Sequence, residues 1–346
     1  MNHNGDKQLA FQLVDAAADA GADFVKFQTF KAAKLATKQA AKASYQTASS
    51  PKTKSQQEML KQLELSHETH FELVKHCQKR GIRFLSAPFD SESAGFLVEE
   101  LSLKLLKIPS GEITNGPLLL EIASRGTPVI LSTGMSNLGD IEMALSVLAH
   151  GYLHPGKPPK TGSFQGAYTS KDGQRILKKN VVLLHCTSEY PAPIEDVNLR
   201  AMATMSKTFG LKVGYSDHTR GIIIPIAATA MGAAVIEKHF TLDRNFPGPD
   251  HKASLEFSEL KEMVEGIRAV ELARGTGIKS VQPSEALNLH VARKSLVALA
   301  PIRKGSSFTI ENLGAKRPGH GLSPMEYWSM LGQKAARDYS EDELIG

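Results

Sequence analysis

Two lysines stand inside short apolar segments, where a charged side chain needs a specific reason to be present. Lys26 lies in the run VKFQ and Lys107 in the run LKIPS. A buried ammonium group is costly unless it meets an anion. One explanation is an internal salt bridge to Glu112 or Glu237, and another is a lysine that forms a Schiff base. A third is a site for phosphate and carboxylate, in which hydroxyls and backbone N–H groups assist the two charges. The hydroxyl groups near these segments belong to Ser110 and to the STG turn that begins at Ser132.

Two histidines also end apolar segments that follow each other along the chain. His218 lies in SDHT and His239 in EKHF. A lone histidine is usually structural, but two at adjacent strand ends can hold one divalent ion and leave positions open for water and substrate. Mixed nitrogen and oxygen ligation suits Mn²⁺, with Mg²⁺ or Co²⁺ as alternatives. Asp250, in PGPDH, is either a turn former or a group that binds a hydroxyl or acts on a metal-bound water.

Three other segments carry polar side chains. The run HCTSEYP at 185–191 suggests a Cys/His nucleophile, but adjacent side chains on a strand face opposite ways and a thiol after a buried strand is usually inert. Tyr190 in the same run is the better substrate contact. Arg317, in KRPGHG, is either part of a solvated turn or a clamp for a substrate oxygen, which would reach a distant site most easily across a dimer. The run NHNG at residues 2–5 indicates only a loop.

A repeating order of segments must position these residues. Short apolar runs, which we expect to be strands, lie at 23–27, 82–85, 104–108, 129–132, 181–185, 212–215 and 235–237. Segments of helical period lie at 7–20, 67–80, 91–101, 117–125, 140–149, 199–209, 221–231 and 258–273. Strict alternation of this kind predicts parallel β-α-β units, and therefore an α/β fold.

Seven strands with eight helices fit an eight-stranded (β/α) barrel whose first strand lies upstream of Met1. Without that strand the barrel would expose two sheet edges. A doubly wound sheet has the same alternation, but its polar clusters gather at one switch point. Here nearly every expected strand runs into polar or charged residues. Because a ring of such ends is the C-terminal face of a barrel, where active sites lie, we favour the barrel.

The alternation is interrupted twice and then ends. Residues 31–65 are predicted to be a long loop, and residues 151–180 an insertion rich in Gly, Pro and Lys. We expect the barrel to occupy 1–276, a linker 277–290, and a small, mostly β domain 291–346, where short strand-like runs alternate with turns.

Composition excludes several classes of protein. The chain has 346 residues, of which 41% are hydrophobic and 22% charged, as in ordinary globular proteins. Its longest weakly polar run, 221–236, contains Pro225 and is too short to span a membrane, and we expect no secretory signal. The net charge of +5 comes mainly from residues 31–61 and 157–179. These stretches are either solvated loops or segments that attract a small anionic substrate. We therefore expect no nucleic-acid or membrane partner. Two cysteines cannot form a disulfide framework, which fits a cytoplasmic location.

Taken together, these segments resemble the sialic acid synthase family, the N-acetylneuraminate synthases that condense phosphoenolpyruvate with N-acetylmannosamine. The resemblance covers essentially the whole chain and depends on the order of its motifs. They are NHNG at 2–5, VKFQT at 25–29, SAPF at 86–89, KIPSGE at 107–112, LSTGM at 131–135, HCT at 185–187, EYP at 189–191, GYSDH at 214–218, EKHFT at 237–241, GPDH at 248–251 and KRPG at 316–319.

The resemblance implies a (β/α)8 TIM barrel followed by an antifreeze-like (SAF) domain, in a domain-swapped homodimer. It implies that His218 and His239 are the metal ligands and that Glu112 is a carboxylate for proton transfer. Positions matching those that hold phosphoenolpyruvate are Lys26, Lys107, Ser110, Ser132 and Ser216. Positions matching amino-sugar contacts are Gln28, Tyr190 and Asp250, and Arg317 matches the arginine given to the partner's site.

The resemblance also implies a reaction. Carbon 3 of phosphoenolpyruvate attacks the open-chain aldehyde, which the metal polarises, and phosphate leaves by C–O cleavage after water adds at carbon 2. N-acetylmannosamine is the expected acceptor. The alternative is a sister synthase for legionaminic or pseudaminic acid, which uses another six-carbon amino sugar. A metal-dependent aldolase would use pyruvate without phosphate release. A non-catalytic sugar- or ice-binding protein would need neither the lysines nor the histidines.

Overall fold

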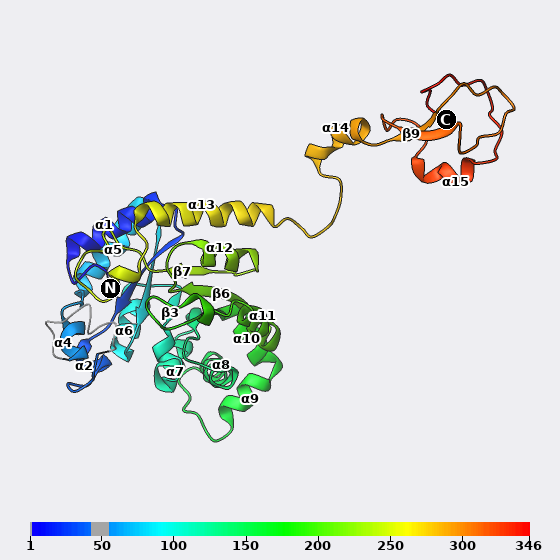
Figure 1. Ribbon diagram of the computed structural model, residues 1–346. Coiled ribbons are helices and arrows are strands. Elements are labelled where there is room, and N and C mark those ends of the chain that lie inside the picture. The colour runs from blue at the N-terminus through cyan, green and yellow to red at the C-terminus, as the bar shows by residue number, and fades with distance from the viewer. Residues whose placement is uncertain (1, 43–54) are drawn as a thin grey trace. The chain divides into compact units, whose positions relative to one another are not determined.

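The structure is a computed structural model that describes residues 2–42 and 55–346 (Figure 1). The chain divides into two compact units, Met1–Gly275 and Thr276–Gly346. No helix among the described residues is long and apolar enough to cross a membrane.

Parallel strands form the centre of the first unit and follow each other in chain order. They are β1 Phe24–Thr29, β2 Arg83–Pro88, β3 Leu106–Ile108, β4 Val129–Ser132, β5 Val181–Cys186, β6 Lys212–Asp217 and β7 Ile236–Lys238. β1 pairs with β2, β3 to β7 pair in sequence, and β2 lies beside β3. A parallel sheet that curls in this order, with a helix after each strand, confirms the prediction of a (β/α) barrel.

Helices surround the strands (Figure 1). They are α1 Lys7–Asp19, α2 Ala32–Leu35, α4 Gln56–Lys61, α5 His67–Arg80, α6 Ser91–Gly95, α7 Gly116–Ser124, α8 Leu138–Leu153, α9 Ser163–Thr169, α10 Lys171–Asn180, α11 Ala201–Phe209, α12 Ile223–Ala230 and α13 Phe257–Ala273. Local sequence explains where they begin: the side chains of Asp6, Ser66 and Asn137 accept hydrogen bonds from backbone N–H groups in the first turns of α1, α5 and α8.

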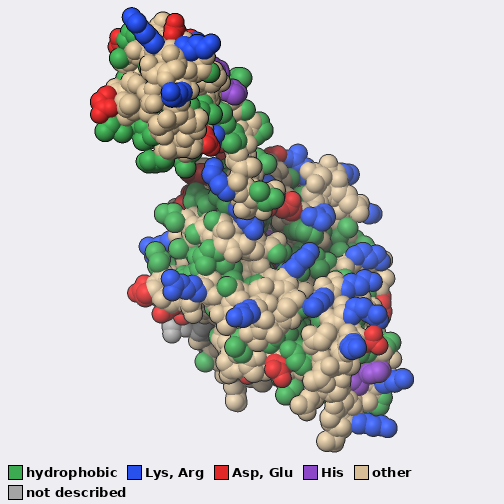
Figure 2. All heavy atoms as spheres, turned by 90° about the vertical axis from the view of Figure 1, so that its right-hand side faces the viewer, with side chains coloured by type: hydrophobic (Ala, Val, Ile, Leu, Met, Phe, Trp, Pro, Cys, Tyr) green, Lys and Arg blue, Asp and Glu red, His purple; other side chains and the backbone are tan. Residues whose placement is uncertain are grey.

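The predicted insertion at 151–180 is more regular than its composition suggests, because it contains α9 and α10. Ser170 caps α10, and Leu177 anchors that helix in the core. The exposed side of α10 carries four basic residues, Lys171, Arg175, Lys178 and Lys179. Figure 2 shows Lys and Arg side chains spread along this side of the molecule.

A cavity of about 390 Å³ lies between β1 and β7. Among the described residues, each of these strands pairs with only one other strand, so each has one edge free of strand pairing. Apolar side chains of α13, including Leu260, Met263 and Ile267, line one part of the cavity. Polar residues of both strands, among them Lys26 and Glu237, line another part.

The second unit is small and has its own core. It contains α14 Pro283–Ala292, β8 Ser295–Ala298, β9 Leu313–Lys316 and α15 Tyr327–Met330. β8 and β9 pair antiparallel and isolated bridges add further pairing, so the prediction of a mostly β domain is confirmed. Helix α14 occupies the second half of the predicted linker, because Pro283 and a Gln282–Glu285 capping box favour a helix start there.

Candidate active site

Strand alternation decides which side chains enter the barrel. Val25 and Phe27 of β1 pack against α1 and α5, so Lys26 and Gln28 face the opposite way. Leu106 and Ile108 of β3 likewise belong to the core under the helices, and Lys107 faces inward. The inward lysines stand beside Leu85 and Ile130, their partners in the strand pairing, which belong to an apolar layer inside the barrel.

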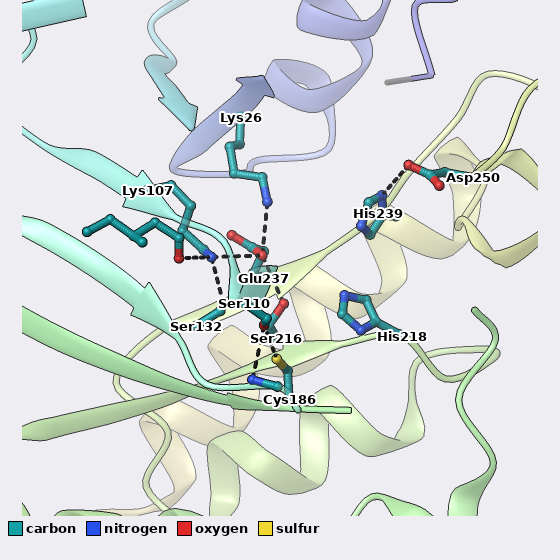
Figure 3. Close-up of polar contacts among 12 residues, drawn as sticks. Lys26, Lys107, Ser110, Ser132, Cys186, Ser216, His218, Glu237, His239 and Asp250 are labelled. Carbon is teal, nitrogen blue, oxygen red and sulfur yellow. Dashed lines mark hydrogen bonds and ion pairs between the residues drawn. The ribbon is translucent and has the colours of Figure 1, made fainter. Parts of the chain in front are cut away.

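The two lysines meet at one carboxylate. Lys26 Nζ lies 2.9 Å from Glu237 Oε1 and Lys107 Nζ lies 3.8 Å from the same atom. Ser216 Oγ donates to that oxygen at 2.8 Å (Figure 3). Of the two carboxylates that the sequence offered as partners, Glu237 therefore forms the internal ion pairs. Glu237 is also the main site residue that sequence reasoning left without a role of its own.

Burial and charge act in opposite directions in this cluster. Lys107 has only 1% of its side chain exposed, and burial lowers its pKa to about 8 although Glu237 opposes the shift. Burial alone would disfavour ionised Glu237, but Lys107 and Lys26 outweigh it and hold the pKa of this carboxyl well below its usual range. The cluster thus carries two positive charges and one negative charge when Lys107 is protonated.

Hydroxyl groups surround the lysines at the carboxyl ends of the strands. Lys107 Nζ donates to Ser132 Oγ at 2.6 Å and to the carbonyl of Ile108 at 3.0 Å. Gly134 N–H donates to Ser110 Oγ at 3.0 Å, and that hydroxyl lies 3.1 Å from Cys186 Sγ. Ammonium, hydroxyl and backbone N–H donors together suit an anion with several oxygens.

Gly134 has no room for a side chain, because an added Cβ would lie 2.2 Å from Ser188 Oγ and 2.9 Å from Ser110 Oγ. Ser188 Oγ is buried and has no hydrogen-bond partner among the described residues. Ser188, which has no role of its own in the sequence prediction, thus lies beside Gly134 and Ser110 on the polar side of the site.

The two histidines face each other across the ends of β6 and β7, with ring centroids 5.5 Å apart (Figure 3). His218 Nδ1 lies 2.6 Å from the carbonyl of Thr187, a contact that fixes this ring and leaves Nε2 for another ligand. Burial lowers the pKa of both rings, well below the usual value for His239. Neutral imidazole is the form that binds a metal ion.

Two neutral imidazoles supply only part of the ligand shell of a divalent ion. The described residues contain no group of three or more His, Cys, Asp or Glu side chains placed to hold a metal. Asp250 lies beside the pair, with Oδ2 3.7 Å from His239 Nδ1. Two histidines would therefore hold the ion and leave positions for water and substrate.

The expected sugar contacts lie on the histidine side. The Tyr190 ring centroid is 4.3 Å from that of His218 and 5.7 Å from that of His239. Gln28 lines the cavity together with His239 and Glu237. Asp250 is 5% exposed, on the loop that follows β7. The site therefore has a lysine side, whose donors suit an anion, and a histidine side.

Glu112 lies in the single helical turn after β3 and forms no ion pair with either lysine among the described residues. Burial raises its pKa, and the charge of Asp90 acts in the same direction, against a hydrogen bond from Asn115 Nδ2 at 2.7 Å. A carboxyl group with a raised pKa is suited to proton transfer. Arg317 belongs to the second unit, where its Nε donates to the carbonyl of Ala292 at 2.9 Å and the side chain is exposed.

Comparison with known proteins gives matches over both units. Residues 13–279 match the NeuB family and residues 293–346 match the SAF domain. The chain is 51% identical over 345 residues to an N,N'-diacetyllegionaminic acid synthase of Campylobacter jejuni, covering 100% of this chain and 96% of the relative. A Legionella pneumophila protein of the same name is 44% identical over 340 residues, with coverages of 98% and 89%. The crystal structure of the N-acetylneuraminic acid (sialic acid) synthetase of Leptospira borgpetersenii is also similar, with 32% identity, a TM-score of 0.66 and coverages of 83% and 86%.

Proposed function

The chain belongs to the NeuB family, and from this membership we propose that it joins phosphoenolpyruvate to a six-carbon sugar carrying two acetamido groups, to form a legionaminic-type acid. The observation that carries the proposal is the convergence of Lys26 and Lys107 on Glu237, beside the hydroxyls of Ser132 and Ser216 and next to the histidine pair. An anion and an aldehyde that must react with each other require these two halves in one pocket.

The choice of acceptor depends on similarity. The chain is 51% and 44% identical to two N,N'-diacetyllegionaminic acid synthases, against 32% for a sialic acid synthetase. These values favour the acceptor of a legionaminic acid synthase, the alternative predicted from the sequence, over N-acetylmannosamine, the acceptor that the sequence led us to expect. N-acetylmannosamine remains the second candidate.

The residues of the anion side would bind and orient phosphoenolpyruvate. Lys26 and Lys107 hold its charge, while Ser110 and Ser132 supply directional hydrogen bonds, and the Gly134 N–H orients the Ser110 hydroxyl. Carbon 3 forms the new bond to the aldehyde carbon, water adds at carbon 2, and the C–O bond to phosphate breaks. Positive charge develops at carbon 2 before water adds, and the Glu237 carboxylate between the lysines is a group of the right sign to stabilise it.

The histidine side would take the sugar. A divalent ion held by His218 and His239, for which we propose Mn²⁺, would supply Lewis-acid polarisation of the aldehyde oxygen. Tyr190, Gln28 and Asp250 line this side and would contact the sugar. Glu112, whose pKa is raised by burial, would donate a proton to the aldehyde oxygen as it becomes a hydroxyl and regain one from the water that adds at carbon 2.

We also propose a cytoplasmic homodimer in which Arg317 reaches the partner's barrel. Both cysteines are free and buried, which suits a reducing compartment. In the second unit α14 buries none of its residues, and Leu287 and Trp328 are 84% and 73% exposed. Large exposed apolar side chains of this kind are common at protein interfaces.

Phosphate release from phosphoenolpyruvate in the presence of Mn²⁺ tests the function. The acceptors are a 2,4-diacetamido hexose, N-acetylmannosamine and no sugar, and pyruvate replaces phosphoenolpyruvate in a parallel reaction followed by product mass. Release only with the diacetamido sugar supports the proposal, and release only with N-acetylmannosamine selects the second candidate. Condensation of pyruvate without phosphate release, or no reaction by folded, metal-loaded protein, would overturn the synthase assignment. Lys107→Met is the matched inactive control.

A further inference from the structure

We propose that the N-terminal turn, residues 2–5, is a positioning element that holds the loop 239–256 so that Asp250 faces His239. The inference goes beyond the proposed function but rests on it for the identity of the sugar that Asp250 would contact. By sequence alone these four residues indicate only a loop. In the structure, Asn2 and His3 are buried, with 6% and 2% exposed.

Asn2 makes the first connection, and it does so as a donor. Its Nδ2 donates to the carbonyl of Phe240 at 2.7 Å and to Ser254 Oγ at 2.8 Å. Ser254 Oγ in turn donates to the carbonyl of Asp250 at 2.6 Å. The Asn2 amide thus joins the start of the loop, at Phe240, to its end, at Ser254. Through the Ser254 hydroxyl it is also connected to the backbone carbonyl of Asp250.

Asn4 makes the second connection, as an acceptor. Its Oδ1 lies 3.1 Å from His251 Nε2, and His251 Nδ1 lies 2.7 Å from Thr241 Oγ1. His251 and Thr241 are both fully buried. Gly248 closes over this contact, because an added Cβ there would lie 2.6 Å from Asn4 Oδ1 and 2.7 Å from His251 Cδ2. The residue after Asp250 is therefore held by the same turn.

The turn is itself fixed, so it can act as a support. Asn4 and Gly5 have φ values of 51° and 76°, in the left-handed region that suits Asn and Gly. An added Cβ at Gly5 would lie 2.2 Å from the carbonyl oxygen of Gln62. Hydrogen bonds within the turn, from Gly5 N–H to His3 Nδ1 and from Asp6 N–H to the carbonyl of His3, close it further.

The opposite roles of the two asparagines allow a test with isosteric changes. Asn2→Asp removes both N–H donors and places a buried charge, whereas Asn4→Asp keeps the oxygen that accepts from His251. We expect Asn2→Asp to raise the KM for the sugar by about tenfold or more, as the loss of two hydrogen bonds implies. The KM for phosphoenolpyruvate should stay within about twofold, because the lysine side of the pocket is untouched. Asn4→Asp should resemble the wild type.

Ser254→Ala provides the same test with a milder change, should Asn2→Asp fail to fold. It breaks the connection from Asn2 to the Asp250 carbonyl and should also raise only the KM for the sugar. Gln8→Ala, an exposed change on α1, is the control for nonspecific effects. Amide hydrogen exchange of residues 239–256 gives a readout without substrate, and exchange should be faster in Asn2→Asp and Ser254→Ala than in Asn4→Asp.

The possible failures are distinguishable. Wild-type protein that turns over no sugar refutes the proposed function, while hydrogen exchange still reports on the turn. An active wild type with unchanged exchange and unchanged sugar KM in Ser254→Ala overturns this inference and leaves the function standing. Equal rises of both KM values would also overturn it, since that result indicates general loss of structure.

Discussion

Replacing Glu237 by glutamine should move the pH dependence of phosphoenolpyruvate binding toward lower pH. In the proposed site Lys107 must be protonated to hold the anion, and burial lowers its pKa to about 8. In the wild type, the association constant should therefore fall as pH rises through about 8, by about tenfold for each pH unit beyond it. Bound phosphoenolpyruvate keeps the ammonium charged, so kcat should stay level to higher pH than kcat/KM.

The distance in the structure sets the size of the shift. Lys107 Nζ and Glu237 Oε1 are 3.8 Å apart, and with an effective dielectric constant of about 20 their attraction is about 4 kcal/mol. Losing all of it would lower the lysine pKa by about three units. Water entering the variant pocket will recover part of this energy, so we expect a shift of about one to three units.

The difference in phosphoenolpyruvate affinity between Glu237→Gln and the wild type should change sign across the pH range. A variant that had merely lost structure would bind more weakly at every pH. Below the shifted pKa, Glu237→Gln should bind phosphoenolpyruvate at least as tightly as the wild type, because a negative charge beside the anion has been removed. Near pH 8 it should bind more weakly, because most of Lys107 is then neutral. Titration calorimetry from pH 5.5 to 9.5 measures both limbs, and thermal melts confirm that the variant is folded.

Glu112→Gln is the matched control, since Glu112 is a buried carboxyl that makes no ion pair with either lysine among the described residues. In Glu112→Gln, phosphoenolpyruvate affinity should still fall near pH 8, as in the wild type, even though the kcat of this variant is lower. If Glu237→Gln leaves the limb in place, or if both variants move it equally, Lys107 is not the group that governs binding. The charge balance inferred for the site would then be wrong.

Two other predictions concern the metal and the dimer. His218→Ala should weaken Mn²⁺ binding by more than about 100-fold in titrations followed by electron paramagnetic resonance, since even supporting residues of metal sites contribute 10- to 100-fold; unchanged Mn²⁺ affinity would place the ion elsewhere. We expect His218→Ala and Arg317→Ala each to be inactive alone. When the two variants are unfolded, mixed in equal amounts and refolded together, about half of the dimers should contain one chain of each kind. Each such dimer has one intact site of two, so the mixture should recover about a quarter of wild-type activity. No recovery from protein shown to be mixed dimer would mean that Arg317 does not act across subunits.

The barrel strands could be predicted because they are short apolar runs followed by polar residues. Every one of the seven predicted runs overlaps an observed strand, from 23–27 with Phe24–Thr29 to 235–237 with Ile236–Lys238. The insertion was harder to predict, since α10 has the sequence KDGQRILKKN and only Gly173, Leu177 and Asn180 are buried. A helix that offers so few apolar positions is stabilised by packing on α8 and α9, which no local pattern reports.

The site residues could be named from the sequence, but their pairing could not. Two lysines and two carboxylates were visible, and either carboxylate could have served. Glu112 lies in a helical turn beyond the end of β3, whereas Glu237 lies within β7, in register with Ser216. Only the curvature of the sheet brings β7 opposite β1 and so decides that Lys26 meets Glu237. Distance along the chain, 211 residues in this case, carries no information about that contact.

The motifs SDH and EKH show how three consecutive residues can serve two purposes. Ser216 and Glu237 are a cross-strand pair facing the lysines, and the next pair in register is Asp217 with Lys238. Because successive side chains of a strand face opposite ways, this second pair points away from the site, toward Tyr215, whose hydroxyl donates to Asp217. Asp217 and Lys238 form an ion pair with 0% and 1% of their side chains exposed.

A buried ion pair adds little net stability but costs about 3–5 kcal/mol when one partner is removed. Asp217 and Lys238 therefore act as a fixed link between β6 and β7, directly before His218 and His239. Asp217 and Lys238, the middle residues of the two motifs, set the distance between the two strand ends. The residues on either side of them, Ser216 and His218 at the end of β6 and Glu237 and His239 at the end of β7, face the pocket. A variant of Asp217 would thus lose activity by displacing both histidines, although its carboxylate touches neither substrate, and the loss would follow the stability of the protein rather than the chemistry of the reaction.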